Sequence, residues 1–466
     1  MMKSYFDKVA EGWREYRRKR SYYWDSITEY CNYFIHPSNS VLEVGCGAGE
    51  LIGTVNGSRK VGIDFCEKLI EQARESQKNV EFHVMAAEKI TLDEKFDVIV
   101  MSNLTGFVND IELIFNQIHK VCHERTRIIV TSYNRMWEPL IRFAEFIGIK
   151  RPTPQQNWLS KKDLINLLYL AGFETYRCNS SMLIPFRIPL ISSLFNRWIS
   201  HLPFFNIFAL NNYHFARPQP QNTDNWQSRY SVSVVIPARN ESGNIQAAVD
   251  RVPEMGNHTE IIFVEGNSTD DTWETIQRVA KNSVRDIKIL QQDGRGKGDA
   301  VRKGYSIASG DILMILDADL TVQPEELPKF YKAIATGKGE FINGVRLVYP
   351  MENGAMRQLN TFGNHFFSNL FSWILESSIK DTLCGTKVMF HEDWQHLTEG
   401  RKFFGDFDPF GDFDMLFGAY KLNLKIIDLP IRYRERKYGT TNISRFSHGL
   451  LLLKMSAFAA SKIRFR

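Results

Sequence analysis

The chain has 466 residues, of which 43% are hydrophobic and 24% are charged, with a formal net charge of +5. This length favours two or three domains, and the composition is that of a folded protein. The small net charge argues against a nucleic-acid partner. The six cysteines are scattered and form no CxxC pair, a pattern that is typical of free thiols in a reducing cytoplasm. We expect neither a membrane span nor a signal peptide, because no apolar run is long enough.

Short apolar runs alternate with longer amphipathic segments on both sides of a polar stretch, "RPQPQNTDNWQSRY", at 217–230. This alternation predicts α/β domains with parallel sheets and crossover helices. We therefore expect a first domain at 1–217, a linker at 218–230 and a second domain at 231–466. The expected strands are 40–46, 60–65, 96–102 and 127–133 in the first domain, and 231–237, 260–266, 286–290 and 311–317 in the second.

A glycine-rich turn, "VLEVGCGAGELI" at 41–52, follows the first expected strand. Its glycines Gly45, Gly47 and Gly49 let the chain turn tightly and let a ligand approach the backbone. Asp64 ends the next expected strand, where its carboxylate can accept both hydroxyls of a ribose. These residues indicate a nucleotide-cofactor pocket, and an ordinary strand-to-helix turn is the alternative.

Residues 2–217 resemble class I S-adenosylmethionine-dependent methyltransferases. The resemblance rests on the pattern ExGxGxG, the acid Asp64 that follows it and "FDVIVMSNL", and it ends in "NNYHFARP". The resemblance implies a Rossmann-like fold with the three glycines at the methionine portion of S-adenosylmethionine, Asp64 at the ribose and Asn103 facing the reacting centre. "MAAEKI" has Ala86 and Ala87 where the family often places an acid for the adenine. The cofactor-binding residues expected from this resemblance are Glu43, Gly45, Gly47, Gly49, Asp64, Glu88 and Asn103. A degenerate domain kept as a scaffold or sensor is the alternative.

Two aspartates, Asp317 and Asp319, end the buried run "GDILMILDADLT" at 310–321. Side chains two residues apart on a strand share a face, so this pair repels unless a cation lies beside it. A divalent metal that also binds a diphosphate would supply that cation. The loop "GRGKGDAVRKG" at 294–304 offers Lys297 and Arg302 to a polyphosphate, and parallel strands bring both features to one edge of the sheet.

The segments "VVIPARNE", "VEGNSTDDT" and "LDADL", in this order, resemble the family 2 glycosyltransferases of the GT-A fold over roughly 231–466. The resemblance implies a nucleotide-diphospho-sugar donor and a Mn²⁺ or Mg²⁺ ion, with Asp319 the better metal ligand of the acidic pair. One departure is Glu265-Gly266, where the family usually has two aspartates. The expected donor-binding residues are Pro237, Arg239, Glu241, Glu265, Lys297, Arg302 and Asp317, and the expected metal ligands are Asp317 and Asp319.

Sugar transfer with inversion needs a carboxylate that takes the acceptor's proton. The segment "FGDFDPFGDFDMLFGAYK" at 404–421 supplies Asp406, Asp408, Asp412 and Asp414. The family's acidic pair before a helix aligns with "GDFD", which assigns Asp412 as the catalytic base and Asp414 as the second candidate. Capping of a helix N-terminus is the alternative role for these acids.

The loop "DTLCGTK" at 381–387 resembles the acceptor-side loop of polyprenyl-phosphate sugar transferases, the dolichyl-phosphate mannose synthase group. "RKYGTTN" at 436–442 matches that group's R-x-x-G-x-S-K loop in Arg436 and its glycine, with Thr441 for the serine and Asn442 for the final lysine. The resemblance implies a glycan or lipid-phosphate acceptor that is contacted by Lys387, Arg436 and Thr441.

Three apolar segments have no motif. The stretch 182–210 is aromatic, with prolines and basic breaks, and we expect it to be a lid or domain-packing element, or else to contact a membrane surface. The stretches 359–375 and 448–466 predict apolar helices, which either pack in the core or contact a membrane from one side.

Together these features predict a bifunctional transferase in the cytoplasm or at the inner face of the membrane. One domain transfers a sugar with a metal and with inversion, and the other methylates a related substrate. An active glycosyltransferase whose methyltransferase domain serves as scaffold or sensor is the alternative. The low net charge disfavours a nucleic-acid methyltransferase.

Overall fold

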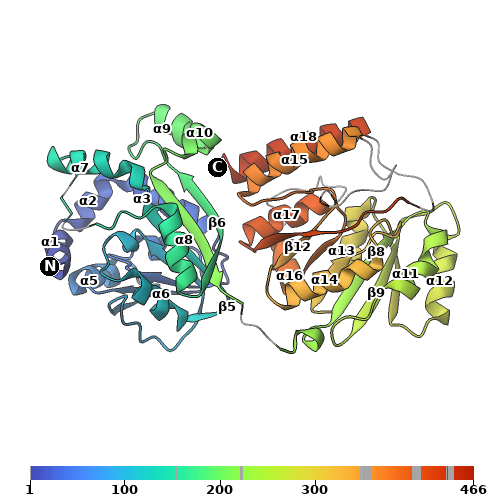
Figure 1. Ribbon diagram of the computed structural model, residues 1–466. Coiled ribbons are helices and arrows are strands. Elements are labelled where there is room, and N and C mark those ends of the chain that lie inside the picture. The colour runs from blue at the N-terminus through green and yellow to red at the C-terminus, as the bar shows by residue number, and fades with distance from the viewer. Residues whose placement is uncertain are drawn as a thin grey trace. The chain divides into compact units, whose positions relative to one another are not determined.

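The computed structural model describes residues 2–150, 152–153, 156–220, 224–346, 348, 358–400, 411–436, 438 and 445–465 (Figure 1). The chain divides into two compact units, one of Met1–Gln219 with Arg464–Arg466 and the other of Pro220–Ile463. Each unit is built around one seven-stranded sheet with helices packed against it. The prediction of two α/β domains is therefore confirmed.

In the first unit the strands lie in the order β3-β2-β1-β4-β5-β7-β6. Their bounds are β1 Ser40–Val44, β2 Arg59–Asp64, β3 Glu81–Val84, β4 Phe96–Ser102, β5 Cys122–Tyr133, β6 Phe173–Ser181 and β7 Asn211–Pro218. Strands β1 to β5 pair in parallel, as expected, whereas β7 runs antiparallel to both β5 and β6. The parallel pairing predicted from the sequence therefore holds for β1 to β5, and the antiparallel edge arises because the chain reverses between the neighbouring strands β6 and β7 instead of crossing the sheet.

The helices of the first unit include several that pack against its sheet. They are α1 Met2–Ala10, α2 Trp13–Lys19, α3 Ser21–Tyr33, α4 Glu50–Thr54, α5 Glu67–Ser76, α6 Ile111–His119, α7 Glu138–Phe146, α8 Lys161–Leu170, α9 Ile191–Ser193 and α10 Pro203–Asn206. Phe115 on α6, Leu164 on α8 and Phe173 on β6 are fully buried in the core. β4 is almost wholly buried, which explains why its sequence is a near-continuous apolar run.

The second unit orders its strands β10-β9-β8-β11-β13-β12-β14. The bounds are β8 Val232–Ala238, β9 Thr259–Glu265, β10 Ile287–Gln291, β11 Ile312–Ile315, β12 Phe341–Val345, β13 Lys387–Phe390 and β14 Ile426–Pro430. The four strands expected from the sequence, β8 to β11, pair in parallel, and β13 inserts antiparallel between β11 and β12. Strand β13 therefore departs from the parallel sheet that the sequence predicts.

Helices of the second unit cover this sheet and include both apolar helices predicted from the sequence. They are α11 Ile245–Arg251, α12 Thr272–Asn282, α13 Lys297–Ile307, α14 Leu327–Ala335, α15 Gln358–Leu375, α16 His391–Gly400, α17 Asp412–Lys421 and α18 Arg445–Ile463. α15 and α18 lie side by side (Figure 1), and each buries one apolar face, with Phe371 and Met455 inside. Core packing therefore accounts for much of their apolar character. None of the described helices is long and apolar enough to cross a membrane.

Candidate active sites

The glycine-rich turn after β1 has a backbone conformation that favours glycine. Gly45, Gly47 and Gly49 have φ angles of 76°, 56° and 77°, in the left-handed region where other residues are strained. A Cβ on Gly49 would lie 2.6 Å from the Phe82 ring, and one on Gly45 would lie 2.7 Å from the Leu104 side chain. The turn therefore depends on glycine for both its conformation and its close packing.

Asp64, at the end of β2, is held against this turn. Its Oδ2 accepts a hydrogen bond from the Gly47 N–H at 2.9 Å, and its Oδ1 accepts one from the Cys66 N–H at 2.9 Å. Burial raises the pKa of Asp64, and the two backbone hydrogen bonds act against that shift. Because each carboxylate oxygen can accept a second hydrogen bond, the group retains capacity for ribose hydroxyls. The structure thus brings together the turn and the acid that the sequence analysis paired.

The two glutamates expected near the cofactor are placed differently from each other. Glu43 is 3% exposed on β1, and its Oε2 accepts a hydrogen bond from the Ile52 N–H at 3.0 Å. Burial raises the pKa of Glu43 to about 8. It anchors the start of α4 beneath the turn, whereas Glu88 is half-buried in the turn that follows β3.

Asn103 follows β4 and lies in a buried polar cluster. Its Nδ2 donates to the Tyr23 hydroxyl at 3.0 Å, and that hydroxyl donates to Asn211 Oδ1 at 3.0 Å. The Asn103 Oδ1 atom is buried and has no hydrogen-bond partner among the described residues. An unpaired buried amide oxygen costs about 1–3 kcal/mol, so a ligand that donates a hydrogen bond would fit here.

Three residues to which the sequence assigns no role contribute to this unit's site: Tyr23, Asn211 and Trp13. Tyr23 and Asn211 are far from Asn103 in the chain, and although the segment "NNYHFARP" begins at Asn211, its pattern does not single that residue out. Trp13 on α2 lies over the glycine turn, 3.7 Å from the position that a Cβ on Gly47 would occupy, and its Nε1 donates to Glu50 Oε1 at 2.8 Å. The N-terminal helices therefore complete this site.

In the second unit, the acidic pair after β11 is neutralised by two cations of the chain. Lys297 Nζ lies 2.5 Å from Asp317 Oδ1, and Arg436 Nη2 donates to Asp319 Oδ2 at 2.6 Å. The Thr321 N–H and hydroxyl donate to Asp319 Oδ1. The predicted repulsion between the aspartates is thus relieved by side chains of the chain itself.

Arg436 also connects the pair to the end of β8. Its Nη1 donates to Glu241 Oε1 at 2.8 Å, and Asn244 Nδ2 donates to the other oxygen of Glu241 at 2.7 Å. Burial raises the pKa of Glu241, and the guanidinium of Arg436 acts against that shift. The backbone near Arg436 is fixed beside the acidic pair, because the Arg434 N–H donates to Thr321 O at 2.9 Å.

The remaining donor-side residues lie at the adjacent ends of β8 and β9. Pro237 on β8 pairs with Val264 on β9. The next residues, Ala238 and Glu265, also pair, and each ends its strand. Glu265 is 2% exposed, and its Oε1 accepts a hydrogen bond from the Ser268 N–H at 2.5 Å. Arg239, directly after β8, is exposed. The parallel register therefore gathers these ends at one edge of the sheet, as the sequence predicts.

Two glycines bring the start of α17 against the start of α13. A Cβ on Gly298 would lie 2.8 Å from Gly411 N, and one on Gly411 would lie 2.6 Å from Gly298 Cα. Arg302 on α13 consequently lies near Asp414, with 3.9 Å between Nη1 and Oδ2. The residue that caps α17 is Gly411, so neither Asp412 nor Asp414 is its N-cap.

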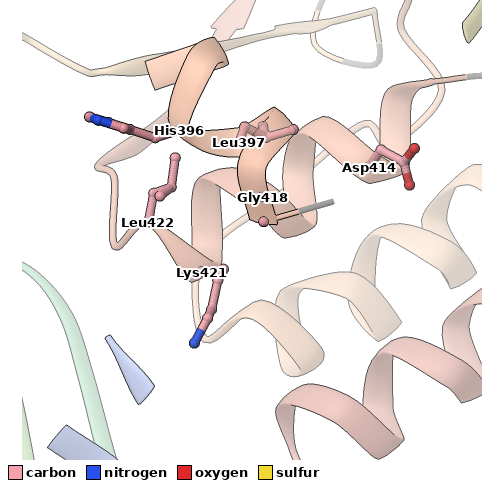
Figure 2. A pocket seen from close by; sticks show the side chains of 7 residues that line it. His396, Leu397, Asp414, Gly418, Lys421 and Leu422 are labelled. Carbon is pink, nitrogen blue, oxygen red and sulfur yellow. The ribbon is translucent and has the colours of Figure 1, made fainter. Parts of the chain in front are cut away.

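Asp412 is the first residue of α17, and its side chain lies outside the described residues, as do Asp406, Asp408, Thr441 and Asn442. Asp414 contributes to a pocket between α16 and α17. Figure 2 shows Asp414 at one end of this pocket and His396 at the other. Leu397, Gly400, Gly418, Lys421 and Leu422 also line it.

The loop 381–387 contacts Asp317 of the acidic pair through Gly385, and buried polar contacts hold it in place. A Cβ on Gly385 would overlap Asp317 Oδ2 and Lys297 Nζ. Asp381 is fully buried and accepts from Arg346 Nε at 2.7 Å and Nη2 at 2.9 Å. Lys387 is also fully buried, and its Nζ donates to Cys384 O. The loop's charged residues therefore support its shape.

No group of three His, Cys, Asp or Glu side chains that could hold a metal occurs in the part of the chain that the structure describes. Asp317 and Asp319 are half-buried oxygen donors of the kind that Mn²⁺ and Mg²⁺ prefer. They fit a metal whose other ligands come from a diphosphate. Such an ion would have to compete with Lys297 and Arg436 for the same carboxylates.

Comparison with known families matches each unit to a different one. Residues 35–166 match the family model described as "Methyltransferase domain", and residues 233–396 match the model described as "Glycosyl transferase family 2". The chain therefore joins an N-terminal region that matches a methyltransferase domain to a C-terminal region that matches family 2 glycosyltransferases.

Curated relatives resemble part of the chain. It is 27% identical over 226 residues to the low-salt glycan biosynthesis hexosyltransferase Agl6 of Haloferax volcanii, covering 47% of this chain and 51% of the relative. It is 37% identical over 109 residues to a dolichol-phosphate mannosyltransferase of Pyrococcus furiosus, covering 23% and 30%. A dolichyl-phosphate hexose transferase of Haloferax volcanii is 26% identical over 226 residues, covering 48% and 91%. The chain thus spans about half or less of the first two relatives.

Proposed function

We propose that the second unit transfers a sugar from a nucleotide-diphospho-sugar to a polyprenyl-phosphate or glycan acceptor, with Mn²⁺ or Mg²⁺. The observation that carries this proposal is the convergence of Asp317, Asp319, Lys297 and Glu241 at one edge of the sheet. A metal-bound diphosphate requires carboxylates and cations in one place. Two of the relatives are named for dolichyl-phosphate or dolichol-phosphate transfer, which supports a lipid-phosphate acceptor.

In the proposed reaction, the bond from the anomeric carbon to the diphosphate breaks while an acceptor oxygen bonds to that carbon from the opposite side. The acceptor's proton goes to a carboxylate, for which we assign Asp412, with Asp414 as the second candidate. Lys297 and Arg302 stabilise the negative charge that develops on the leaving diphosphate. A metal held by Asp317 and Asp319 would supply further neutralisation when bound.

For the first unit we propose S-adenosylmethionine-dependent methylation of a related substrate. When bound, S-adenosylmethionine would supply the methyl group: the bond from the methyl carbon to sulfur would break as an acceptor lone pair bonds to that carbon, S-adenosylhomocysteine would leave, and the proton of a hydroxyl or amine acceptor would pass to solvent. The glycine turn and Asp64 hold the cofactor, and the unpaired Asn103 Oδ1 accepts a hydrogen bond from the methyl acceptor, which orients the attacking lone pair.

The alternative is a first unit that binds S-adenosylmethionine as a scaffold or sensor without methyl transfer. The observation that favours it is the pair Ala86 and Ala87 at the position where the resemblance leads one to expect an acid for the adenine. Calorimetric binding of S-adenosylmethionine without any methyl transfer to membrane or soluble extracts would support this alternative.

The first experiment is donor turnover by the full chain with Mn²⁺, a polyprenyl phosphate and a panel of UDP-, GDP- and dTDP-sugars, followed as nucleotide release. We expect one donor to be consumed only with metal, and Asp319→Asn to abolish the reaction. Asp250→Asn is the matched control, because that carboxylate is exposed on α11 away from the acidic pair. Metal-independent turnover, or full activity of Asp319→Asn, would refute the metal role.

A further inference from the structure

The first unit presents an apolar face on the segment between β6 and β7 and on the neighbouring α7. We define this apolar face by Phe186, Leu190, Phe204 and Ile207 on the segment and Leu140 and Phe143 on α7. Leu190 is 88% exposed and Phe204 is 67% exposed. Hydrogen bonds from Asn134 and Trp137, just before α7, to the backbone of Ile207 and Phe208 hold these two elements together. Several exposed large apolar side chains on adjoining elements are typical of a surface that binds a partner or a lipid.

The segment that carries the face is internally fixed, although its outer side chains are exposed. Asn196 Oδ1 accepts hydrogen bonds from the Leu183 and Ile184 N–H groups at 2.8 and 2.9 Å, and Asn196 Nδ2 donates to Ile184 O at 2.7 Å. The Ser192 hydroxyl accepts from the Ile188 N–H at 2.8 Å. The polar backbone is thus satisfied inside the segment while the apolar side chains face outward, which is what a lipid-contacting surface requires.

The charge of this segment selects among partners. Residues 182–210 contain no aspartate or glutamate, and both of their arginines, Arg187 and Arg197, are exposed. On α7, Glu138 is paired with Arg142. Glu145, the other carboxylate of α7, is paired with Lys150. The segment 182–210, with its apolar side chains, two exposed arginines and no carboxylate, therefore complements anionic lipid headgroups above an acyl layer.

Hydrogen bonds connect the apolar face to the predicted reacting centre. Asn134, directly after β5, donates from Nδ2 to Ile207 O and Ala209 O at 2.9 Å. Asn196 Nδ2 donates to the hydroxyl of Tyr22, whose neighbour Tyr23 bonds Asn103. The face therefore lies at the same edge of the sheet as Asn103.

We propose that the apolar face docks on an anionic lipid bilayer and that the methyl acceptor is carried by a lipid in that bilayer. This inference rests on the proposed function and gives its methylation step a substrate class. Docking through Leu190 and Phe204 brings the Asn103 edge to the membrane surface, so the acceptor reaches the site without leaving the bilayer.

Vesicle flotation of the full chain tests the docking. We expect binding to vesicles of phosphatidylcholine with phosphatidylglycerol, and weaker binding to phosphatidylcholine alone. Leu190→Asp with Phe204→Asp should weaken binding by more than about tenfold, because two inserted side chains are lost. Arg187→Gln should weaken it about fivefold on anionic vesicles only.

The control is Val284→Asp, since Val284 is fully exposed in the second unit, between α12 and β10. Unchanged thermal unfolding of every variant excludes a folding defect. Equal binding of Leu190→Asp with Phe204→Asp and of the parent chain would overturn the docking. The docking would also be overturned if the parent chain did not bind vesicles but formed a dimer in sedimentation velocity, and if the double variant did not form that dimer.

The acceptor class is tested with S-adenosylmethionine labelled in the methyl group, incubated with the chain and cell membranes. We expect the label in the organic-extractable lipid fraction, and loss of that label with Leu190→Asp and Phe204→Asp. Label confined to water-soluble products would overturn the lipid acceptor while leaving methyl transfer intact. No label in any fraction, with vesicle binding retained, would instead refute the proposed methylation.

Discussion

Arg436 donates a hydrogen bond from Nη2 to Asp319 Oδ2 at 2.6 Å, and this pair occupies the carboxylate that the sequence assigns to a metal. The same guanidinium bonds Glu241. The guanidinium of Arg436 thus occupies the position at Asp319 where the sequence predicts a metal ion. In the proposed reaction, a metal that binds Asp319 would displace Arg436, and the guanidinium would then be available to the acceptor phosphate.

Removing this guanidinium should therefore strengthen metal binding. We expect Arg436→Ala to bind Mn²⁺ about tenfold more tightly in calorimetric titrations, because Asp319 no longer has a competing cation. Arg434→Ala is the control, since that side chain is exposed and only its backbone N–H contacts Thr321. Unchanged or weaker Mn²⁺ affinity in Arg436→Ala would show that the two cations do not compete.

The contact between Gly298 and Gly411 should control the placement of α17. We expect Gly298→Ala to destabilise the second unit by about 1–3 kcal/mol, since its Cβ would press on the Gly411 backbone. Donor turnover should fall about tenfold as Asp412 and Asp414 move away from α13. Urea unfolding and nucleotide release measure the two effects.

Gly363→Ala on α15 is the matched control, because nothing lies within 4 Å of its added Cβ. That change should stabilise the helix by up to about 1 kcal/mol. A similar gain in Gly298→Ala would mean that the two helices separate without cost.

The buried pair Arg346–Asp381 should be essential for the stability of the acceptor-side loop. Although burial by itself would raise the pKa of Asp381, the Arg346 guanidinium holds it below its ordinary value. We expect Arg346→Met to lower the free energy of unfolding of the second unit by about 3–5 kcal/mol, because a buried carboxylate loses its partner. Arg278→Met, on an exposed position of α12, should stay within about 0.5 kcal/mol of the parent chain. Equal stabilities would refute the structural role of the pair.

Glu43 should make the first unit less stable as the pH rises. Its pKa of about 8 in the folded unit exceeds its ordinary value, so the folded state binds more protons than the unfolded state. The stability that Glu43 contributes is present below about pH 4.5 and is lost as the pH rises through 8, with a slope of up to ~1.4 kcal/mol per pH unit.

Glu43→Gln keeps an acceptor for the Ile52 N–H but cannot ionise. We expect it to flatten the pH dependence of the first unit's free energy of unfolding between pH 5 and 8. The measurement is urea unfolding of the full chain followed by pulse proteolysis, in which the N-terminal fragment that survives reports the folded first unit. If the free energy of unfolding changed with pH in the same way for the parent chain and for Glu43→Gln, Glu43 would be ionised in the folded state.

The sequence alone determined the two α/β units, the eight expected strands and the edges where the candidate residues gather. These follow from local rules: apolar runs become buried strands, and parallel strands place their carboxyl ends together. Asp64 therefore meets Gly47, and Lys297 meets Asp317, as the spacing predicts.

Only the tertiary structure decided which groups pair across long separations. Arg436 lies against Asp319, Tyr23 against Asn103 and Gly298 against Gly411, and no local pattern in the sequence specifies these contacts. The antiparallel direction of β7 and of β13 was likewise not predicted, because an apolar run has the same appearance in either direction. Strand direction and long-range pairing depend on how the whole chain satisfies its buried hydrogen bonds and charges.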